Sequence, residues 1–548
     1  MKKLSLLLLF ALASSDLLAQ GALRGQVEAL ADLLGKVQVR KDQYDQMLLY
    51  QPDAPYRITL QVTEIDNRGR ETRMKYRVNL GLLSVGEIDL DEGRDRLEIT
   101  IGGGREPMVQ MLEEEELAGY EKELVFLATD IDNARAIRDL LREIVPLARE
   151  RWETDAALPT TYEDLLHWVS ERVVDVEFED ERYGQTWTQL DHPSRIQFAQ
   201  EADGDRYLYV FNLADLSPSD IEMDVRRTEA TVELRTNDRR NYIQVTENGE
   251  RDNFDDDFDI QCPNAEAAQV LAYGLRKLPG LARELPANQA KKYSTQAQAL
   301  RALQAAITDF NHGGYYVRQS LTGGCQAVYQ RNIDDDGDAE AAEFQVDFAD
   351  FDPGDVEIEV ARAQVAIQVK TRDGRDFIYV QEDGEQQNYE DDLSFPVADI
   401  PAAKQALQAL QAVIRLCPRD VEGLNWTEVQ ARIASASTQL DDITQQVELM
   451  AGDRCKWAAT ILEEGRRSEE TRYEFNLYDL DPSRVEIDVK GTQIWLELAT
   501  TGGDDIIKTI TDGEEAGFTD DLALGASSIP EAKALQATLQ AMIRGCKE

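Results

Sequence analysis

The sharpest candidate for chemistry is an acidic segment whose oxygen-bearing side chains recur at the spacing of a calcium-binding loop. Gly337 stands at the sixth position, where such loops turn sharply. The candidate ligands are Asn332, Asp334, Asp336, Asp338 and Glu343. The first ligand is Asn rather than Asp, and strands are expected on both sides, so the segment is no EF-hand. It predicts calcium as the one candidate cofactor, against the simpler interpretation of a solvated acidic turn.

Other residue types that catalyse reactions form no recognisable group. Acidic pairs follow a recurring aromatic residue, and they would hold a cation; carboxylate pairs are too abundant in this chain for any of them to indicate the acid and base of a hydrolase. The pairs are Asp255-Asp256, Asp391-Asp392 and Asp520-Asp521. In so acidic a chain they more simply keep strand edges from pairing. The three histidines show no ligand spacing and no Gly-x-Ser-x-Gly elbow is present, so the sequence assigns no catalytic residue. The histidines are His167, His192 and His312.

The elements that would position these residues belong to a repeat. One phrase, clearest at Tyr473–Val489, recurs four times at intervals of 133, 135 and 129 residues. Alternating apolar residues predict two strands, and a central Leu-x-Pro-Ser predicts the turn between them. We therefore expect four copies of one unit. The equivalent anchors are Asn79, Asn212, Asp347 and Asn476.

Two further features recur, the first in three copies and the second in all four. Asn-Gly or Asp-Gly pairs predict hairpin turns, and each pair precedes an aromatic residue. These aromatics are Phe254, Tyr389 and Phe518; copy one keeps Tyr120 but has no turn glycine. Each copy then closes with an amphipathic helix, which Ser528 and Glu531 start as a capping box in the fourth copy.

The expected fold class is α+β, with four tandem repeats, each a short helix, about seven mostly antiparallel strands and a C-terminal helix. The expected boundaries are a signal peptide at 1–19 and repeats at 20–153, 154–288, 289–421 and 422–548. This order of elements is similar to the pleckstrin-homology superfold, a strongly bent sheet capped by a C-terminal helix. The likeness is one of fold only and implies no function. Cystatin-like and other helix-on-sheet arrangements remain open.

The five cysteines fit this repeat. Cys325 and Cys417 occupy the same places in copy three as Cys455 and Cys546 in copy four, with separations of 92 and 91 residues. We predict disulfides Cys325–Cys417 and Cys455–Cys546, each tying the closing helix to the sheet. Loops of this length would stabilise the fold by roughly 4–5 kcal/mol each in the chain-entropy model. Cys262 is left over and is expected to be a buried thiol.

The N-terminus and the charge set the compartment and the classes of partner. Lys2 and Lys3 precede a short apolar run and a small-residue exit at Ala19, which is typical of a bacterial secretory signal. The expected location is therefore periplasmic or secreted, without membrane insertion after signal removal. A formal charge of −47 repels nucleic acid and anionic membranes.

The residues that recur are strand apolars, turn residues and helix caps, and no polar site is shared. We therefore expect a non-catalytic exported binding or scaffold protein of the bacterial envelope or exterior, presenting its four units to a protein or glycan partner. One alternative is a secreted hydrolase with a carboxylate-based site in one diverged repeat. Another is a calcium-dependent surface module. The sequence predicts no particular ligand and no oligomeric state.

Overall fold

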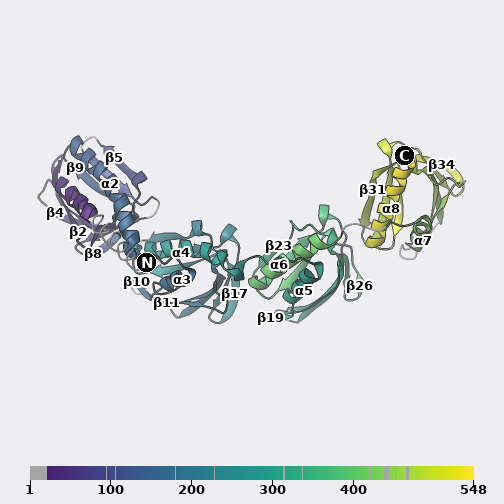
Figure 1. Ribbon diagram of the computed structural model, residues 1–548, viewed down its shortest axis with the longest axis horizontal. Helices are drawn as coiled ribbons and strands as arrows, with labels where there is room; N and C mark the ends of the chain where they lie inside the picture. Colours follow the sequence, from purple (N-terminus) through teal and green to yellow (C-terminus); the bar gives the residue numbers. More distant parts are fainter. Residues whose placement is uncertain are drawn as a thin grey trace, which may run out of the picture. The chain divides into compact units, whose positions relative to one another are not determined.

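The computed structural model divides the chain into two compact parts, Met1–Gln289 and Ala290–Glu548, here called the N-terminal and C-terminal halves. The described residues are 21–93, 96–104, 107–178, 181–226, 229–312, 315–335, 337–418, 423–436, 443–450, 452–464 and 468–548. The expected signal peptide and Asp336 lie outside them. Each half contains two of the four repeats (Figure 1).

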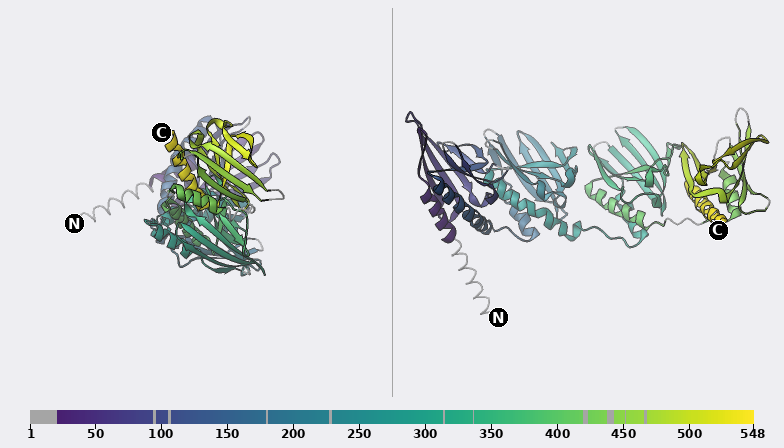
Figure 2. Two further views of the ribbon diagram at one scale, coloured as in Figure 1. Left: turned by 90° about the vertical axis from the view of Figure 1, so that its right-hand side faces the viewer. Right: turned by 90° about the horizontal axis from the view of Figure 1, so that it is seen from above.

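Each repeat has a short helix, two antiparallel sheets and a long closing helix, so the expected four-fold α+β repetition is confirmed. Repeats 1 to 3 have a six-stranded and a three-stranded sheet, and repeat 4 has a five-stranded and a three-stranded one. These are eight or nine strands per repeat, where about seven were expected. In repeat 1 the larger sheet has the order β1-β2-β3-β4-β7-β8 and the smaller β5-β6-β9, and the other repeats follow the same scheme. Figure 2 shows the long helix of each repeat on one side of its strands.

The strands of the N-terminal half divide equally between its repeats. Those of repeat 1 are β1 Lys36–Val39, β2 Asp42–Gln51, β3 Ala54–Ile65, β4 Glu71–Asn79, β5 Ile88–Glu92, β6 Leu97–Gly102, β7 Val109–Glu113, β8 Glu116–Glu121 and β9 Glu123–Ala128. Those of repeat 2 are β10 Val176–Phe178, β11 Glu181–Gln189, β12 Arg195–Ala202, β13 Asp205–Asn212, β14 Glu222–Arg226, β15 Glu229–Arg235, β16 Ile243–Glu247, β17 Glu250–Asp255 and β18 Asp257–Cys262.

The C-terminal half repeats this order with one strand fewer in repeat 4. The strands of repeat 3 are β19 Phe310–His312, β20 Tyr315–Gly323, β21 Gln326–Asp335, β22 Asp338–Asp347, β23 Glu357–Ala361, β24 Gln364–Lys370, β25 Tyr379–Glu382, β26 Glu385–Gln386 and β27 Asp392–Val397. Those of repeat 4 are β28 Ile443–Leu449, β29 Lys456–Glu463, β30 Glu469–Asn476, β31 Leu480–Lys490, β32 Gln493–Thr500, β33 Ile507–Thr511, β34 Glu514–Thr519 and β35 Asp521–Ala526.

The helices begin at polar caps. The closing helices are α2 Ile131–Ala156, α4 Ala265–Glu284, α6 Ile400–Leu416 and α8 Ile529–Lys547. The short helices cover residues 21–33, α3 Tyr162–Ser170, α5 Gln296–Ala306 and α7 Trp426–Ala436. Before each closing helix a polar side chain accepts a hydrogen bond from the backbone N–H three residues on, which satisfies a donor of the first turn. These caps are Asp130, Asn264, Asp399 and Ser528. None of the described helices is long and apolar enough to cross a bilayer.

The anchor of the recurring phrase is an element of backbone structure. Asn79 Oδ1 accepts a hydrogen bond from the backbone N–H of Gly81 at 3.0 Å, which starts the 3₁₀ turn η1 (Leu80–Leu82). Asn or Asp does the same at the start of η3 (Leu213–Asp215), η7 (Phe348–Asp350) and η9 (Leu477–Asp479). The recurrence of these residues is thus explained by a local turn.

A glutamine that was not predicted to be structural joins the two sheets of every repeat, and it is buried in repeats 1, 2 and 4 and half-buried in repeat 3. Gln46 donates to the carbonyl of Leu127 and accepts from its N–H, both at 2.8 Å. Gln185 with Gln261 and Gln445 with Gly525 form the same pair of bonds. In repeat 3 the partner of Gln319 is Pro396, which has no N–H, and the Tyr329 hydroxyl donates to Gln319 Oε1 instead, at 2.8 Å.

Both expected disulfides are present. Cys325–Cys417 and Cys455–Cys546 join Cα atoms 5.6 and 5.8 Å apart, and each ties the end of a closing helix to the residue before β21 or β29. Disulfides persist in oxidising compartments, so the pair is consistent with a location outside the cytoplasm. Cys262 is free and buried.

Candidate functional site

The residues of the expected calcium site lie on a tight hairpin between β21 and β22. The register pairs Asn332 with Ala341 and Glu343 with Gln330, while Asp334 and Asp338 are close to the turn. Asp334 accepts the backbone N–H of Gly337 at 2.9 Å, and Gln330 donates to Glu343 at 2.9 Å. Asp336 is outside the described residues. The hairpin brings Asp334 and Asp338 to one end, and Glu343 lies several residue pairs further along the ladder, so calcium binding here stays a prediction.

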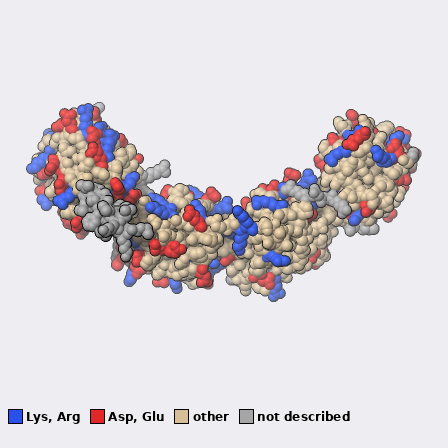
Figure 3. All heavy atoms as spheres, in the orientation of Figure 1, with Lys and Arg blue, Asp and Glu red and all other residues tan. Residues whose placement is uncertain are grey.

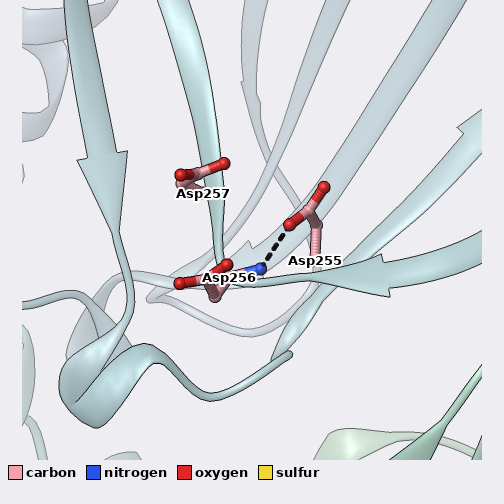
Figure 4. A group of neighbouring side chains, drawn as sticks. All are labelled: Asp255, Asp256 and Asp257. Atoms are coloured by element: carbon pink, nitrogen blue, oxygen red, sulfur yellow. Dashed lines mark hydrogen bonds between the residues drawn. The ribbon is translucent and has the colours of Figure 1, made fainter.

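The structure brings three carboxylates together elsewhere, in repeat 2. Oxygens of Asp255, Asp256 and Asp257 lie within 4.8 Å of one another at the junction of β17 and β18 (Figure 4). Asp255 is exposed and the other two are half-buried. The backbone N–H of Asp256 donates to Asp255 at 2.8 Å, and Arg235 lies 3.2 Å from Asp257. Two of the three belong to an acidic pair that the sequence analysis had noted.

Two carboxyl groups at this junction have raised pKa values. Burial, a hydrogen bond with Glu233 and the charge of Asp255 raise the pKa of Asp257, which Arg235 partly opposes. Burial and the charge of Asp257 raise the pKa of Asp259 as well. Such a group can share a proton or hold a cation. We identify in it a candidate acid–base pair but no nucleophile and no substrate position.

The histidines and the free thiol are spread over unrelated sites. His167 is exposed and lies 3.3 Å from Glu171, and His312 contacts the carbonyl of Ala398 at 2.7 Å. His192 lies 3.1 Å from the hydroxyl of Ser194, but Ser194 is fully buried and therefore out of reach of a substrate. Burial raises the pKa of the Cys262 thiol to about 12, which keeps it protonated and unreactive.

A large cleft lies inside the C-terminal half, where repeats 3 and 4 meet. It has two adjoining parts of about 1030 and 700 Å³. Its walls include an aromatic, two cationic and one anionic side chain, which are Phe377, Arg372, Lys533 and Asp350, together with Gln326 and Pro530. This cleft was not predictable from the sequence, because no pattern within one repeat shows which residues two repeats bring together.

An ion pair crosses the cleft. The ammonium of Lys533 contacts the carboxylate of Asp350 and lies 3.8 Å from that of Asp347. Its Nζ also lies 5.4 Å from the ring centre of Phe377. Burial raises the pKa of Asp350, and the charge of Lys533 partly offsets this rise. Asp350 Oδ2 and Arg372 Nε are buried and form no hydrogen bond with any described residue.

The surface carries charges of both signs. On the face shown in Figure 3, acidic and basic residues are interspersed, with apolar and neutral areas between them. The net charge of −47 is thus not gathered into one acidic patch on that face. A binding site would therefore depend on local groups such as those of the cleft.

Comparison of the chain with protein-family models, with curated proteins and with solved structures found no match.

Proposed function

We propose that this chain is a non-catalytic binding or scaffold protein, exported to the bacterial envelope or beyond, that presents surfaces of its four repeats to a protein partner. The observation that carries the proposal is the use made of the repeated residues. The recurring Asn or Asp starts a turn, the recurring Gln joins two sheets, and the helix caps bond their own helices. What is retained four times is the scaffold, while the exposed residues differ.

The cleft of the C-terminal half supports a protein as the partner. Aromatic residues and arginine are enriched at protein interfaces, where they form the centres of binding. The cleft offers Phe377, Tyr389, Arg372 and Arg375 side by side along its walls. A glycan is the other outcome of the test below.

The test is affinity capture from the envelope fraction of the host, followed by titration calorimetry with the purified partner. Wild-type chain is compared with Arg375→Asp, which reverses a charge at the cleft, and with Arg318→Asp, an exposed arginine of the same repeat outside it. We expect a protein that binds wild type and Arg318→Asp, and that Arg375→Asp binds at least about tenfold more weakly. Equal binding to all three variants would remove the cleft from the proposal, and capture of a glycan alone would replace the protein.

A secreted hydrolase is the second candidate, favoured by the raised pKa values of Asp257 and Asp259 in repeat 2. Turnover of peptide or glycan substrates by the wild-type chain, abolished in Asp257→Asn, would establish it. Turnover that survives this substitution would move the site elsewhere.

A further inference from the structure

Both halves of the chain use two of the same positions where one repeat packs on the next, while the ion pair of each junction lies at different positions of the repeat. In the N-terminal half, repeat 1 meets the start of α4 in repeat 2. The Tyr120 hydroxyl accepts the backbone N–H of Ala265 at 3.2 Å, and Arg57 pairs with Glu266 at 2.8 Å. Met108, on the neighbouring strand connection, is only 7% exposed.

In the C-terminal half, repeat 3 meets the start of α8 in repeat 4 through the equivalent residues. Tyr389 and Phe377 occupy the positions of Tyr120 and Met108, and both pack at the margin of the apolar core of repeat 4. The backbone N–H of Tyr389 also donates to the carbonyl of Gly491 at 3.3 Å. Asp350 of the 3₁₀ turn pairs with Lys533, five residues into the closing helix.

Repeat 4 carries this surface too, but no described residue covers it. Phe518 stands at the position of Tyr120 and Tyr389, and Ile506 at that of Met108 and Phe377. They are 57% and 44% exposed, among the most exposed large apolar residues of the chain. Lys456 stands opposite Asn476 in the strand register, as Arg57 stands opposite Asn79. Asp479 is the last residue of its 3₁₀ turn, as Asp350 is of its own.

The start of α2 in repeat 1 has the matching charges. Asp132 is the second residue of α2, as Glu266 is of α4, and Arg135 is the fifth, as Lys533 is of α8. Their side chains are 91% and 59% exposed. Docking repeat 4 on this helix start would place Lys456 against Asp132, which repeats the Arg57–Glu266 pair. It would also place Asp479 against Arg135, which repeats the Asp350–Lys533 pair.

We propose that the surface formed by Lys456, Asp479, Ile506 and Phe518 of repeat 4 binds the start of α2 in repeat 1 of a second copy of this chain. The contact uses two different patches, so it is heterologous and joins copies head to tail into rings or filaments. It does not depend on what the four repeats bind, and it accounts for the exposure of two large apolar side chains.

The test is sedimentation velocity of the full chain at concentrations from about 1 to 100 μM in physiological salt. We expect oligomers that grow with concentration, and a dissociation constant raised at least about tenfold by Phe518→Glu or by Arg135→Asp. Leu49→Glu is the matched control, because Leu49 is 44% exposed but lies on β2, away from both patches. Circular dichroism confirms that each variant is folded.

Mixing the two defective variants tests the head-to-tail geometry. A Phe518→Glu chain keeps the helix start of repeat 1, and an Arg135→Asp chain keeps the surface of repeat 4. Together they should form a dimer of twice the chain mass and nothing larger, while each alone stays monomeric. The double variant Asp479→Arg with Arg135→Asp should regain association with itself. A wild-type chain that remains monomeric at 100 μM, or oligomers indifferent to Phe518→Glu, would overturn the proposal.

Discussion

The two halves of the chain fasten their closing helices by different chemistry. In the N-terminal half, Arg149 near the end of α2 donates to the carbonyls of Gly81 and Leu83 at 3.2 and 2.7 Å. Arg283 near the end of α4 does the same to Ala214 and Leu216. In the C-terminal half a disulfide holds the equivalent end of α6 and of α8. One scaffold thus tolerates two fastenings, of which only the second depends on an oxidising compartment.

The junctions between repeats also differ between the two halves. Buried apolar residues of repeats 1 and 2 form one continuous cluster, and Trp152 and Tyr273 extend across it with ring centres 5.2 Å apart. The core of repeat 4 contains only its own buried residues, with Phe377 and Tyr389 at the margin, and the polar contacts across the junction include the Lys533–Asp350 pair and the Tyr389–Gly491 hydrogen bond. The C-terminal half should therefore be the more sensitive to redox state and to pH.

Removal of a disulfide should have the largest effect. The double variant Cys455→Ala with Cys546→Ala opens a loop of 91 residues, so the C-terminal half should lose roughly 4–5 kcal/mol of stability. For a part of this size the melting temperature should fall by roughly 10–20 °C. Differential scanning calorimetry measures it, with a reducing agent on the wild type as the parallel experiment. The transition of the N-terminal half is the internal control, and its equal displacement would contradict the comparison.

Breaking the ion pair across the cleft should come next. Lys533 and Asp350 are 15% and 12% exposed, so Lys533→Met leaves a buried carboxylate uncompensated and should cost about 3 kcal/mol at neutral pH. Because the pKa of Asp350 is raised in the folded state, its ionised form disfavours folding above that pKa. As the pH falls through it, Asp350 takes up a proton, and the loss should shrink.

Urea unfolding between pH 4 and 7 measures this dependence. Asp350→Asn removes the charge that Lys533 compensates, so the double variant Lys533→Met with Asp350→Asn should regain most of the stability lost. A cost that is independent of pH, or one that the second substitution leaves unchanged, would show that the loss comes from packing of the lysine stem rather than from its charge.

The sequence was sufficient to predict the features that recur at the same position in successive repeats. The even spacing of Asn79, Asn212 and their equivalents predicted four units, and the matched positions of four cysteines predicted both disulfides. One turn was not predicted. Glu114 and Glu115 adopt φ values of 50° and 77°, the geometry that Asn248 and Gly249 adopt at 51° and 90°. The cue for such a turn is glycine, and repeat 1 lacks it.

Contacts between distant elements were beyond the sequence. Gln46 lies on β2, where the alternation of polar and apolar residues predicts that a polar side chain faces solvent. It is nevertheless only 4% exposed, because β9 lies across it. The cleft and the pairing of Lys533 with Asp350 depend on how repeat 3 packs on repeat 4. The Asp255–Asp257 cluster is different, because its three residues are consecutive in the sequence and only the first two were noted, as an acidic pair.

The smallest effect should come from the arginine fastening of the N-terminal half. Arg149→Met keeps the apolar stem but removes two charge-assisted hydrogen bonds that are only partly buried. The free energy of unfolding should therefore fall by about 1–3 kcal/mol. A methyl group on Gly81 would lie 2.8 Å from the Ala148 carbonyl, so the helix and the turn are in close contact there and the bond is hard to replace. Hydrogen-exchange mass spectrometry should show faster exchange at the end of α2 and in residues 80–84. Arg142→Met, an exposed arginine of α2 with a side chain 48% exposed, should leave both segments unchanged. If Arg149→Met leaves them unchanged as well, packing of the helix alone fastens it, and the contrast between the two halves is reduced to the presence or absence of a disulfide.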